Sequence, residues 1–120
     1  MIHHVVIEVS DLPRAATFYD ALLSPLGWRR HVNGTGAIGY GISRAQLFIT
    51  ERTGVRAEGT MVSLGAPGIA AVKAAWEAGV KSGGSNVAQP GETSAHGSGS
   101  YSAFLRDPDG HDIEITVSSD

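Results

Sequence analysis

The chain has 120 residues, a formal net charge of −3 and 42% hydrophobic residues, which is enough for one compact domain with its own core. Acidic and basic residues are mixed along the chain, so no basic patch points to nucleic acid or an anionic membrane as a partner. The absence of cysteine excludes disulfides, thiolate metal sites and cysteine nucleophiles. No apolar run approaches the roughly 18–20 residues of a membrane span and no signal-peptide pattern opens the sequence, so we expect a cytoplasmic protein.

The first half of the sequence predicts a strand, a helix and three further strands. Residues 4–9 alternate between apolar and polar positions, as a strand with one buried face does. Ser10-Asp11 offers an N-cap for a helix with an early proline, Pro13. The predicted buried stripe of this helix consists of Leu12, Ala15, Ala16, Tyr19, Leu22 and Leu23. Pro25-Leu26-Gly27 ends the helix, and strands are predicted at residues 28–32, 38–42 and 46–50.

The second half repeats this plan after a polar linker at residues 51–59. Its predicted elements are a strand at residues 60–65, a helix at about 68–78, a short strand near 87–89, a glycine- and serine-rich loop at 90–99 and a strand at 100–106. The helix has a predicted buried stripe of Ile69, Val72, Ala75 and Trp76 and a predicted C-terminal cap at Gly79. The period of about 57 residues between the halves indicates internal duplication.

A tight turn is predicted near the end of the chain. Asp107, Pro108 and Gly110 suit positions i, i+1 and i+3 of a type I turn between two strands. His111 follows this turn directly, and we expect its side chain to be solvated.

The strand after the turn carries one carboxylate, Glu114, among aliphatic residues. The alternation of side chains places a set of residues opposite the aliphatic faces of the strands, where they would line one cavity: His4, Met61, Ser63, Glu114 and Thr116. A carboxylate on the inner face of a sheet needs a partner. A metal ion is one candidate, and the imidazole of His4 is another.

Four segments carry a resemblance to a known family: Ile2-His3-His4-Val5-Val6-Ile7-Glu8-Val9-Ser10-Asp11, Phe18-Tyr19, Pro25-Leu26-Gly27-Trp28 and Asp107-Pro108-Asp109-Gly110-His111-Asp112-Ile113-Glu114. In these segments the chain resembles the vicinal oxygen chelate superfamily, which includes glyoxalases, bleomycin-resistance proteins and extradiol dioxygenases. The resemblance implies an α+β fold of two βαβββ modules, whose curled mixed sheets form a cavity. It places a single domain at residues 1–120, with module one at about 1–50, a linker at 51–59 and module two at about 60–118. It also implies a small-molecule ligand or substrate and a homodimer.

The resemblance further implies positions for a divalent metal, which would be zinc, nickel, manganese or iron. Family members carry the ligands on the first and fourth strands of each module, and the matching donors here are His4, Gln46 and Glu114. Met61 stands where the second module usually has a histidine, and a thioether is a poor ligand for these metals. In an enzyme of this family the metal chelates two neighbouring oxygens of the substrate, and Glu114 would serve as a ligand and as the general base.

Besides a structural or regulatory dimer that retains the fold alone, two functions remain open at this point. One is a metal-dependent lyase- or dioxygenase-type enzyme with an incomplete ligand set, and the other is a metal-free small-molecule-binding or antibiotic-sequestering protein. In both cases we expect Met61 in the cavity, Phe48 and Tyr101 as aromatic walls, and His96 in the loop at the cavity mouth.

Overall fold

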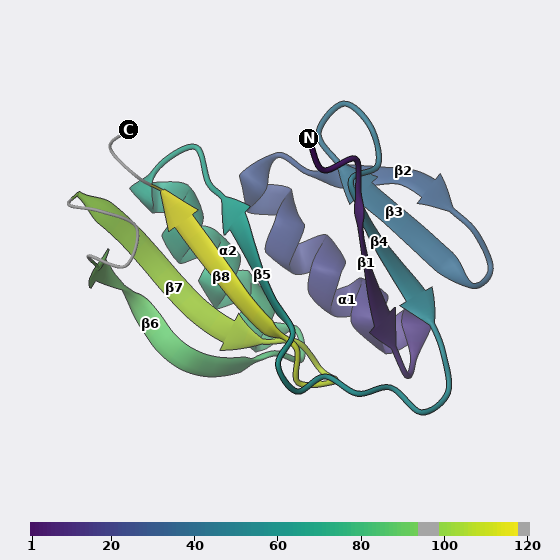
Figure 1. The fold of residues 1–120 in the computed structure, drawn as a ribbon. Helices are drawn as coiled ribbons and strands as arrows, with labels where there is room; N and C mark the ends of the chain where they lie inside the picture. Colours follow the sequence, from purple (N-terminus) through teal and green to yellow (C-terminus); the bar gives the residue numbers. More distant parts are fainter. Residues whose placement is uncertain (94–98, 118–120) are drawn as a thin grey trace.

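The computed structural model describes residues 1–93 and 99–117, which form an α+β fold of two similar modules (Figure 1). The first module contains β1 (Val5–Val9), α1 (Leu12–Leu23), a 3-10 turn (Ser24–Leu26), β2 (Arg29–Asn33), β3 (Ala37–Gly41) and β4 (Leu47–Glu51). The second contains β5 (Met61–Gly65), α2 (Ile69–Lys81), β6 (Ser85–Thr93), β7 (Ser100–Arg106) and β8 (Asp112–Val117). The predicted order of one strand, one helix and three strands in each half is confirmed. Neither helix in the described part of the chain has the length and apolar character needed to cross a membrane.

Each module builds its own four-stranded mixed sheet. The strand orders are β1-β4-β3-β2 and β5-β8-β7-β6, and in both sheets the first strand of the module pairs in parallel with the last. The remaining pairs are antiparallel. The same topology in both halves is what an internal duplication predicts.

The two sheets lie side by side, with edge strands β1 and β5 next to each other and running in opposite directions (Figure 1). We call the space between these two strands the seam. Helices α1 and α2 pack against each other and cover one face of the sheets. The opposite face of each sheet, which we call the open face, carries no helix.

Helix α1 begins and ends at the predicted signals. The Asp11 carboxylate accepts a hydrogen bond from the backbone N–H of Arg14 at 3.0 Å, which satisfies one of the unpaired N–H groups of the first turn. After the 3-10 turn, Gly27 adopts a left-handed backbone with φ 83°, a conformation that favours glycine. All six predicted stripe residues are buried, and Phe18 joins them in the core.

Two predictions for the second helix are wrong. The helix does not end at Gly79 but continues to Lys81, and Gly79 is buried inside it. A Cβ at this position would lie 2.7 Å from Leu105 Cδ1 and 3.0 Å from Leu22 Cδ1, which is too close. This glycine therefore allows close packing rather than a cap. Ile69, predicted to be buried, is 50% exposed at the start of the helix. Hydrophobic periodicity predicts which side of a helix faces the core. It does not predict how many turns of the helix the sheet and the other helix cover.

Glycine is required at the end of β3. A Cβ on Gly41 would overlap the backbone carbonyl oxygen of Arg44 in the tight connection to β4. We expect Gly41→Ala to lower the free energy of unfolding by about 2 kcal/mol, because the backbone of the connection must move to admit the methyl group. Gly36→Ala is the matched control, since a Cβ at Gly36 meets nothing within 4 Å. Urea denaturation checks both, and equal stabilities for the two variants would contradict this account.

Candidate cavities along the module seam

The seam contains a cavity at each end. The first, which we call the His4 cavity, has a volume of about 230 Å³ and lies where β1 begins and β5 ends. It is lined by Ile2, His3, His4, Val5, Trp28, Gln46, Leu47, Val62, Ser63, Leu64 and Gly65. The second, which we call the His111 cavity, has a volume of about 270 Å³. It is lined by Val6, Ile7, Glu8, Arg56, Thr60 and His111.

Two imidazoles supply much of the polarity of the His4 cavity. The Nδ1 atoms of His3 and His4 lie 2.9 Å apart, so one ring donates a hydrogen bond to the other. The His4 ring also meets the edge of Phe48, with ring centroids 5.3 Å apart and planes at 75°. The backbone carbonyl of His3 accepts a hydrogen bond from the Arg44 guanidinium at 2.9 Å. These contacts hold both imidazoles beside the apolar wall of the cavity.

The structure divides the predicted metal ligands between two places. His4 and Gln46 line the His4 cavity together. Glu114 lies on β8, where it is 1% exposed and in register with Ser63 of β5 and Phe104 of β7. Alternation along the strands turns Glu114 and Ser63 to the open face of the second sheet. Glu114 does not line the His4 cavity.

The predicted contact residues also lie in different places. Met61 opens β5 and is 52% exposed, and Phe48 is partly buried on β4. Tyr101 lies in register with Val117 and packs against the core, on the face of β7 that the helices cover. His96 lies outside the described residues. Trp28 and His3 line the His4 cavity although neither was predicted as a site residue. His3 could have been found from the sequence, because it is the direct neighbour of the proposed ligand His4.

The described residues do not bring together a site for a tightly held divalent ion. Within residues 1–93 and 99–117, no three His, Cys, Asp or Glu side chains group closely enough to hold a metal. Structural and catalytic zinc sites use at least three protein ligands. His4 and Gln46 alone offer one imidazole and one weak amide donor, so we derive no chemical step from a metal.

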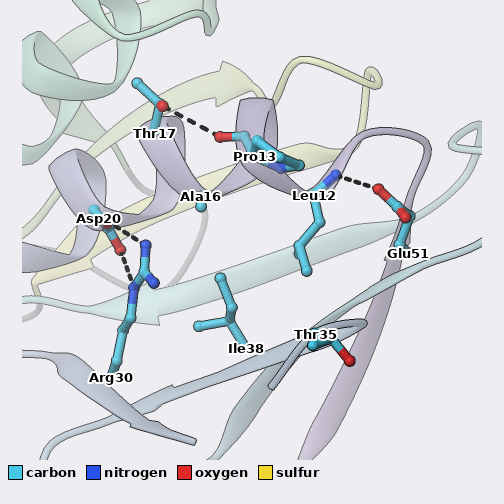
Figure 2. Close-up of a pocket in the computed structure, with 9 residues that line it drawn as sticks. All are labelled: Leu12, Pro13, Ala16, Thr17, Asp20, Arg30, Thr35, Ile38 and Glu51. Carbon is cyan, nitrogen blue, oxygen red and sulfur yellow. Dashed lines mark hydrogen bonds and ion pairs between the residues drawn. The ribbon is translucent and has the colours of Figure 1, made fainter. Parts of the chain in front are cut away.

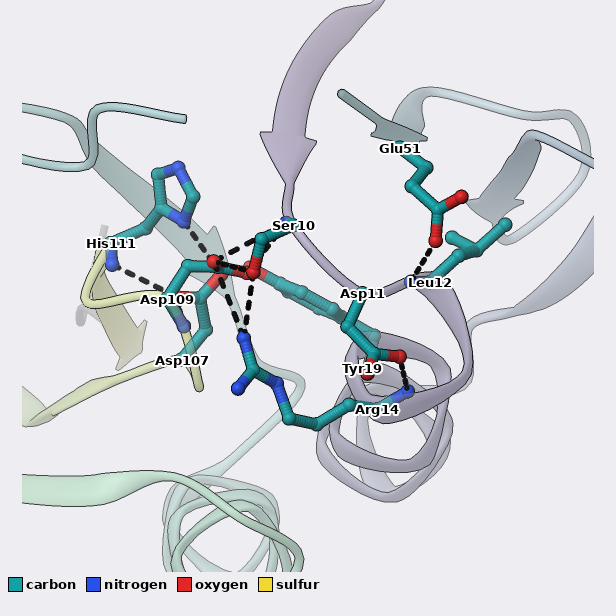
Figure 3. A network of polar contacts seen from close by, with 9 residues as sticks. All are labelled: Ser10, Asp11, Leu12, Arg14, Tyr19, Glu51, Asp107, Asp109 and His111. Carbon is teal, nitrogen blue, oxygen red and sulfur yellow. Dashed lines mark hydrogen bonds and ion pairs between the residues drawn. The ribbon is translucent and has the colours of Figure 1, made fainter. Parts of the chain in front are cut away.

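The expectation that His111 is solvated is wrong. The side chain is 3% exposed, and its Nδ1 lies 2.8 Å from Asp107 Oδ2 (Figure 3). The predicted type I turn places the two residues together, with Gly110 N–H donating to the Asp107 carbonyl at 2.9 Å. Tyr19 Oη donates to the same carboxylate at 2.6 Å. Burial and the Asp107 carboxylate raise the pKa of Tyr19 well above its usual value.

A second carboxylate in the turn reaches the first module. Asp109 accepts hydrogen bonds from the backbone N–H and the hydroxyl of Ser10, and pairs with the Arg14 guanidinium at 3.3 Å (Figure 3). We call these residues the clasp: Ser10, Arg14, Tyr19, Asp107, Asp109 and His111. The clasp joins the β1–α1 end of module one to the β7–β8 turn of module two.

A larger groove of about 520 Å³ lies between α1 and the strands β2 and β3 (Figure 2). Its ionic groups are already engaged within the protein. The Arg30 guanidinium forms a two-pronged contact with Asp20, at 2.9 and 2.7 Å, and Glu51 Oε2 accepts the N–H of Leu12 at 2.8 Å. Its polar groups therefore stabilise α1 and β2, and they do not converge on a ligand.

The Asp20 ion pair predicts a dependence of stability on pH. Burial raises the pKa of Asp20, but hydrogen bonds from Arg30 and Tyr40 outweigh this effect and lower the pKa overall. The pair therefore stabilises the fold above the unfolded pKa of about 4 and is lost as the pH falls through the lower folded value. We expect Arg30→Gln to cost less than about 1 kcal/mol at pH 7 and nothing at strongly acid pH. Urea denaturation at both pH values checks this; an equal cost at both would contradict it.

Comparison with known proteins decides the family. The model of the Glyoxalase/Bleomycin resistance protein/Dioxygenase superfamily matches residues 1–115. The chain belongs to this superfamily. The family predicted from the four sequence segments is thereby confirmed. A search of curated proteins found no match.

Solved structures of superfamily proteins share the fold. A glyoxalase/bleomycin resistance protein from Albidiferax ferrireducens is 29% identical, covers 95% of this chain and 96% of its own, and has a TM-score of 0.84. A glyoxalase-related enzyme from Fulvimarina pelagi is 21% identical, covers 98% and 88%, and has a TM-score of 0.72. A glyoxalase/bleomycin resistance protein/dioxygenase family enzyme from Burkholderia phytofirmans is 16% identical, covers 97% of both chains, and has a TM-score of 0.75. At these two lower identities the likeness concerns the fold alone.

Proposed function

We propose that the protein binds a small organic molecule in the His4 cavity and that binding needs no divalent metal. The composition of the cavity wall carries this proposal. Trp28, Leu47 and Leu64 supply apolar surface, and His4 and Gln46 supply hydrogen-bonding groups at the same site. Apolar walls with a few convergent polar groups are typical of ligand pockets.

The size of the cavity limits the ligand. A volume of about 230 Å³ is below the roughly 300–1,000 Å³ of pockets for drug-sized molecules. A one-ring compound with one or two hydroxyl or carbonyl groups fits this space and matches its polarity. A glycopeptide as large as bleomycin does not, so the size argues against sequestration of such a molecule in this cavity.

The metal-dependent alternative requires a site that the described residues do not supply. Glu114 would have to join His4 and Gln46 as a ligand and act as the general base. It lies instead on the second sheet, and Met61 offers only a thioether in the place of the usual histidine.

Thermal unfolding in the presence of a chelator tests the proposal. We expect catechol and related one-ring phenols to raise Tm by a few degrees at ten times Kd, and bleomycin to leave Tm unchanged. Ser63→Phe, which fills the His4 cavity, should abolish the shift. Ser43→Phe, at an exposed position that lines no described cavity, is the matched control. Either of two results would refute the proposal: no shift with any one-ring probe, or an equal shift in the two variants.

A homodimer forms a second part of the proposal. Val6 and Met61 are each 52% exposed, and Ile42 is 58% exposed. A second copy of the chain would cover such side chains, and the family resemblance points to a homodimer. Light scattering after size exclusion is expected to give twice the 12.5 kDa of one chain, and a monomer at micromolar concentration would contradict this.

A further inference from the structure

His111 is a buried titratable group for which the proposed function has no use. Its Nδ1 lies 2.8 Å from the carboxylate of Asp107, which also accepts hydrogen bonds from Tyr19 Oη and from the backbone N–H of His111. A carboxylate offers only acceptors, so Nδ1 carries the proton and donates it to Asp107. The same contact fixes the plane of the ring. The opposite nitrogen, Nε2, is therefore the atom that remains for a ligand.

The polar surroundings of Nε2 are those of the His111 cavity. In the described part of the chain, Nε2 has no hydrogen-bond partner and the Arg56 guanidinium has no ion pair. The Glu8 carboxylate, the one acid that lines the cavity, already pairs with Arg52 at 3.2 Å. Arg52 balances the charge of Glu8, so the Arg56 guanidinium is the unpaired charge among the described residues that line the cavity. Thr60 adds a hydroxyl to the cavity wall.

We propose that the His111 cavity binds a small oxyanion, either a carboxylate or a phosphate. Arg56 supplies the positive charge, and His111 Nε2 and the Thr60 hydroxyl donate hydrogen bonds to the anion. With Nδ1 committed to Asp107, Nε2 is the ring nitrogen that faces the anion, and a proton on Nε2 makes the hydrogen bond to it. The anion would be held by a charge-assisted contact to a ring that Asp107 has already oriented.

This proposal is independent of the function proposed for the His4 cavity. The two cavities lie at opposite ends of the seam and share no lining residue. The charged and titratable groups around the His111 ring are Asp107 at Nδ1, Tyr19 beyond Asp107, and Glu8 and Arg56 on the cavity wall. The test must therefore observe the Nε2 atom itself, because a change in overall charge would not separate these groups.

Nitrogen NMR of the ¹⁵N-histidine-labelled protein gives that readout. Acetate and inorganic phosphate are added in separate arms, at constant ionic strength, up to about 50 mM, well above a millimolar Kd. We expect the His111 Nε2 resonance to move saturably as the bound anion accepts a hydrogen bond from Nε2. Saturation with acetate alone assigns a carboxylate site, saturation with phosphate alone assigns a phosphate site, and saturation with both assigns a general oxyanion site.

Variants decide whether the response belongs to this cavity. Arg56→Gln is expected to weaken binding about tenfold, the size of one lost charge-assisted contact. Lys73→Gln removes the same charge from an exposed position on α2 and should leave Kd within about twofold. His111→Asn keeps a donor for Asp107 but lacks Nε2, and should bind neither anion. The proposal is overturned if neither anion gives a saturable Nε2 response, or if Arg56→Gln and Lys73→Gln weaken binding equally.

Discussion

Asp107→Ala is expected to lower the free energy of unfolding by about 3–5 kcal/mol, the largest loss of stability that we predict for a single substitution. Asp107 is 3% exposed and accepts hydrogen bonds from Tyr19 Oη, His111 Nδ1 and two backbone N–H groups, those of Asp109 and His111. Alanine leaves these donors buried without an acceptor. Each such group costs about 1–3 kcal/mol. Domains of this size are stable by only about 5–15 kcal/mol, so this loss is a large fraction of the total.

Urea denaturation followed by circular dichroism measures this loss. Asp112→Ala is the matched control, because Asp112 is a partly exposed acid at the start of β8 that pairs with Arg106 at 2.9 Å, and its loss should cost less than about 1 kcal/mol. Tyr19→Phe removes one donor together with its need for an acceptor, so we expect it to cost about 1 kcal/mol. If Asp107→Ala were no more costly than Asp112→Ala, the clasp would not stabilise the fold.

Asp109→Ala is expected to cost about 2–3 kcal/mol, the second largest effect. The Asp109 side chain is only 8% exposed and joins the two modules through Ser10 and Arg14. Its loss leaves the Ser10 N–H and the Arg14 guanidinium without their shared acceptor. The cost should therefore depend on Arg14 being present.

A double-mutant cycle with Arg14→Leu tests this dependence. We expect a coupling free energy of about 1 kcal/mol between Asp109 and Arg14, because the pair is partly buried and shares a hydrogen-bond network with Ser10. Lys81→Leu is a suitable partner for a control cycle, since Lys81 pairs with Glu77 on the exposed face of α2. Coupling to Asp109 that is no stronger for Arg14 than for Lys81 would show that the modules are held together elsewhere.

Local signals in the sequence were sufficient to predict the strand–helix order of both halves. The Asp11 cap, the buried stripe of α1 and the turn from Asp107 to Gly110 all depend on neighbours within a few residues. The errors at Ile69, Gly79 and His111 concern burial. Burial depends on which distant residues cover a position, such as Leu22 and Leu105 over Gly79, and a single sequence does not give that.

In the candidate site, too, local features could be predicted from the sequence and contacts between distant residues could not. Strand alternation indicated that His4 and Glu114 point away from the aliphatic faces, but it could not indicate that they lie on different sheets. Tyr101 could have been assigned better, because it alternates in phase with Ala103 and Leu105, which face the helices. Trp28 lines the His4 cavity directly after the left-handed turn at Gly27. Hydrophobic periodicity does not predict in which direction the chain leaves such a turn.

Amide chemical-shift mapping on the chelator-treated protein tests metal-independent binding in the His4 cavity most directly. On titration with catechol, we predict saturable shifts concentrated at residues 2–5, 28, 46–47 and 62–65, the positions that line the cavity. Addition of zinc or nickel should leave the fitted Kd unchanged within about twofold. Shifts that begin only after metal is added, or that concentrate around Phe104, Glu114 and Thr116 on the second sheet, would contradict the account.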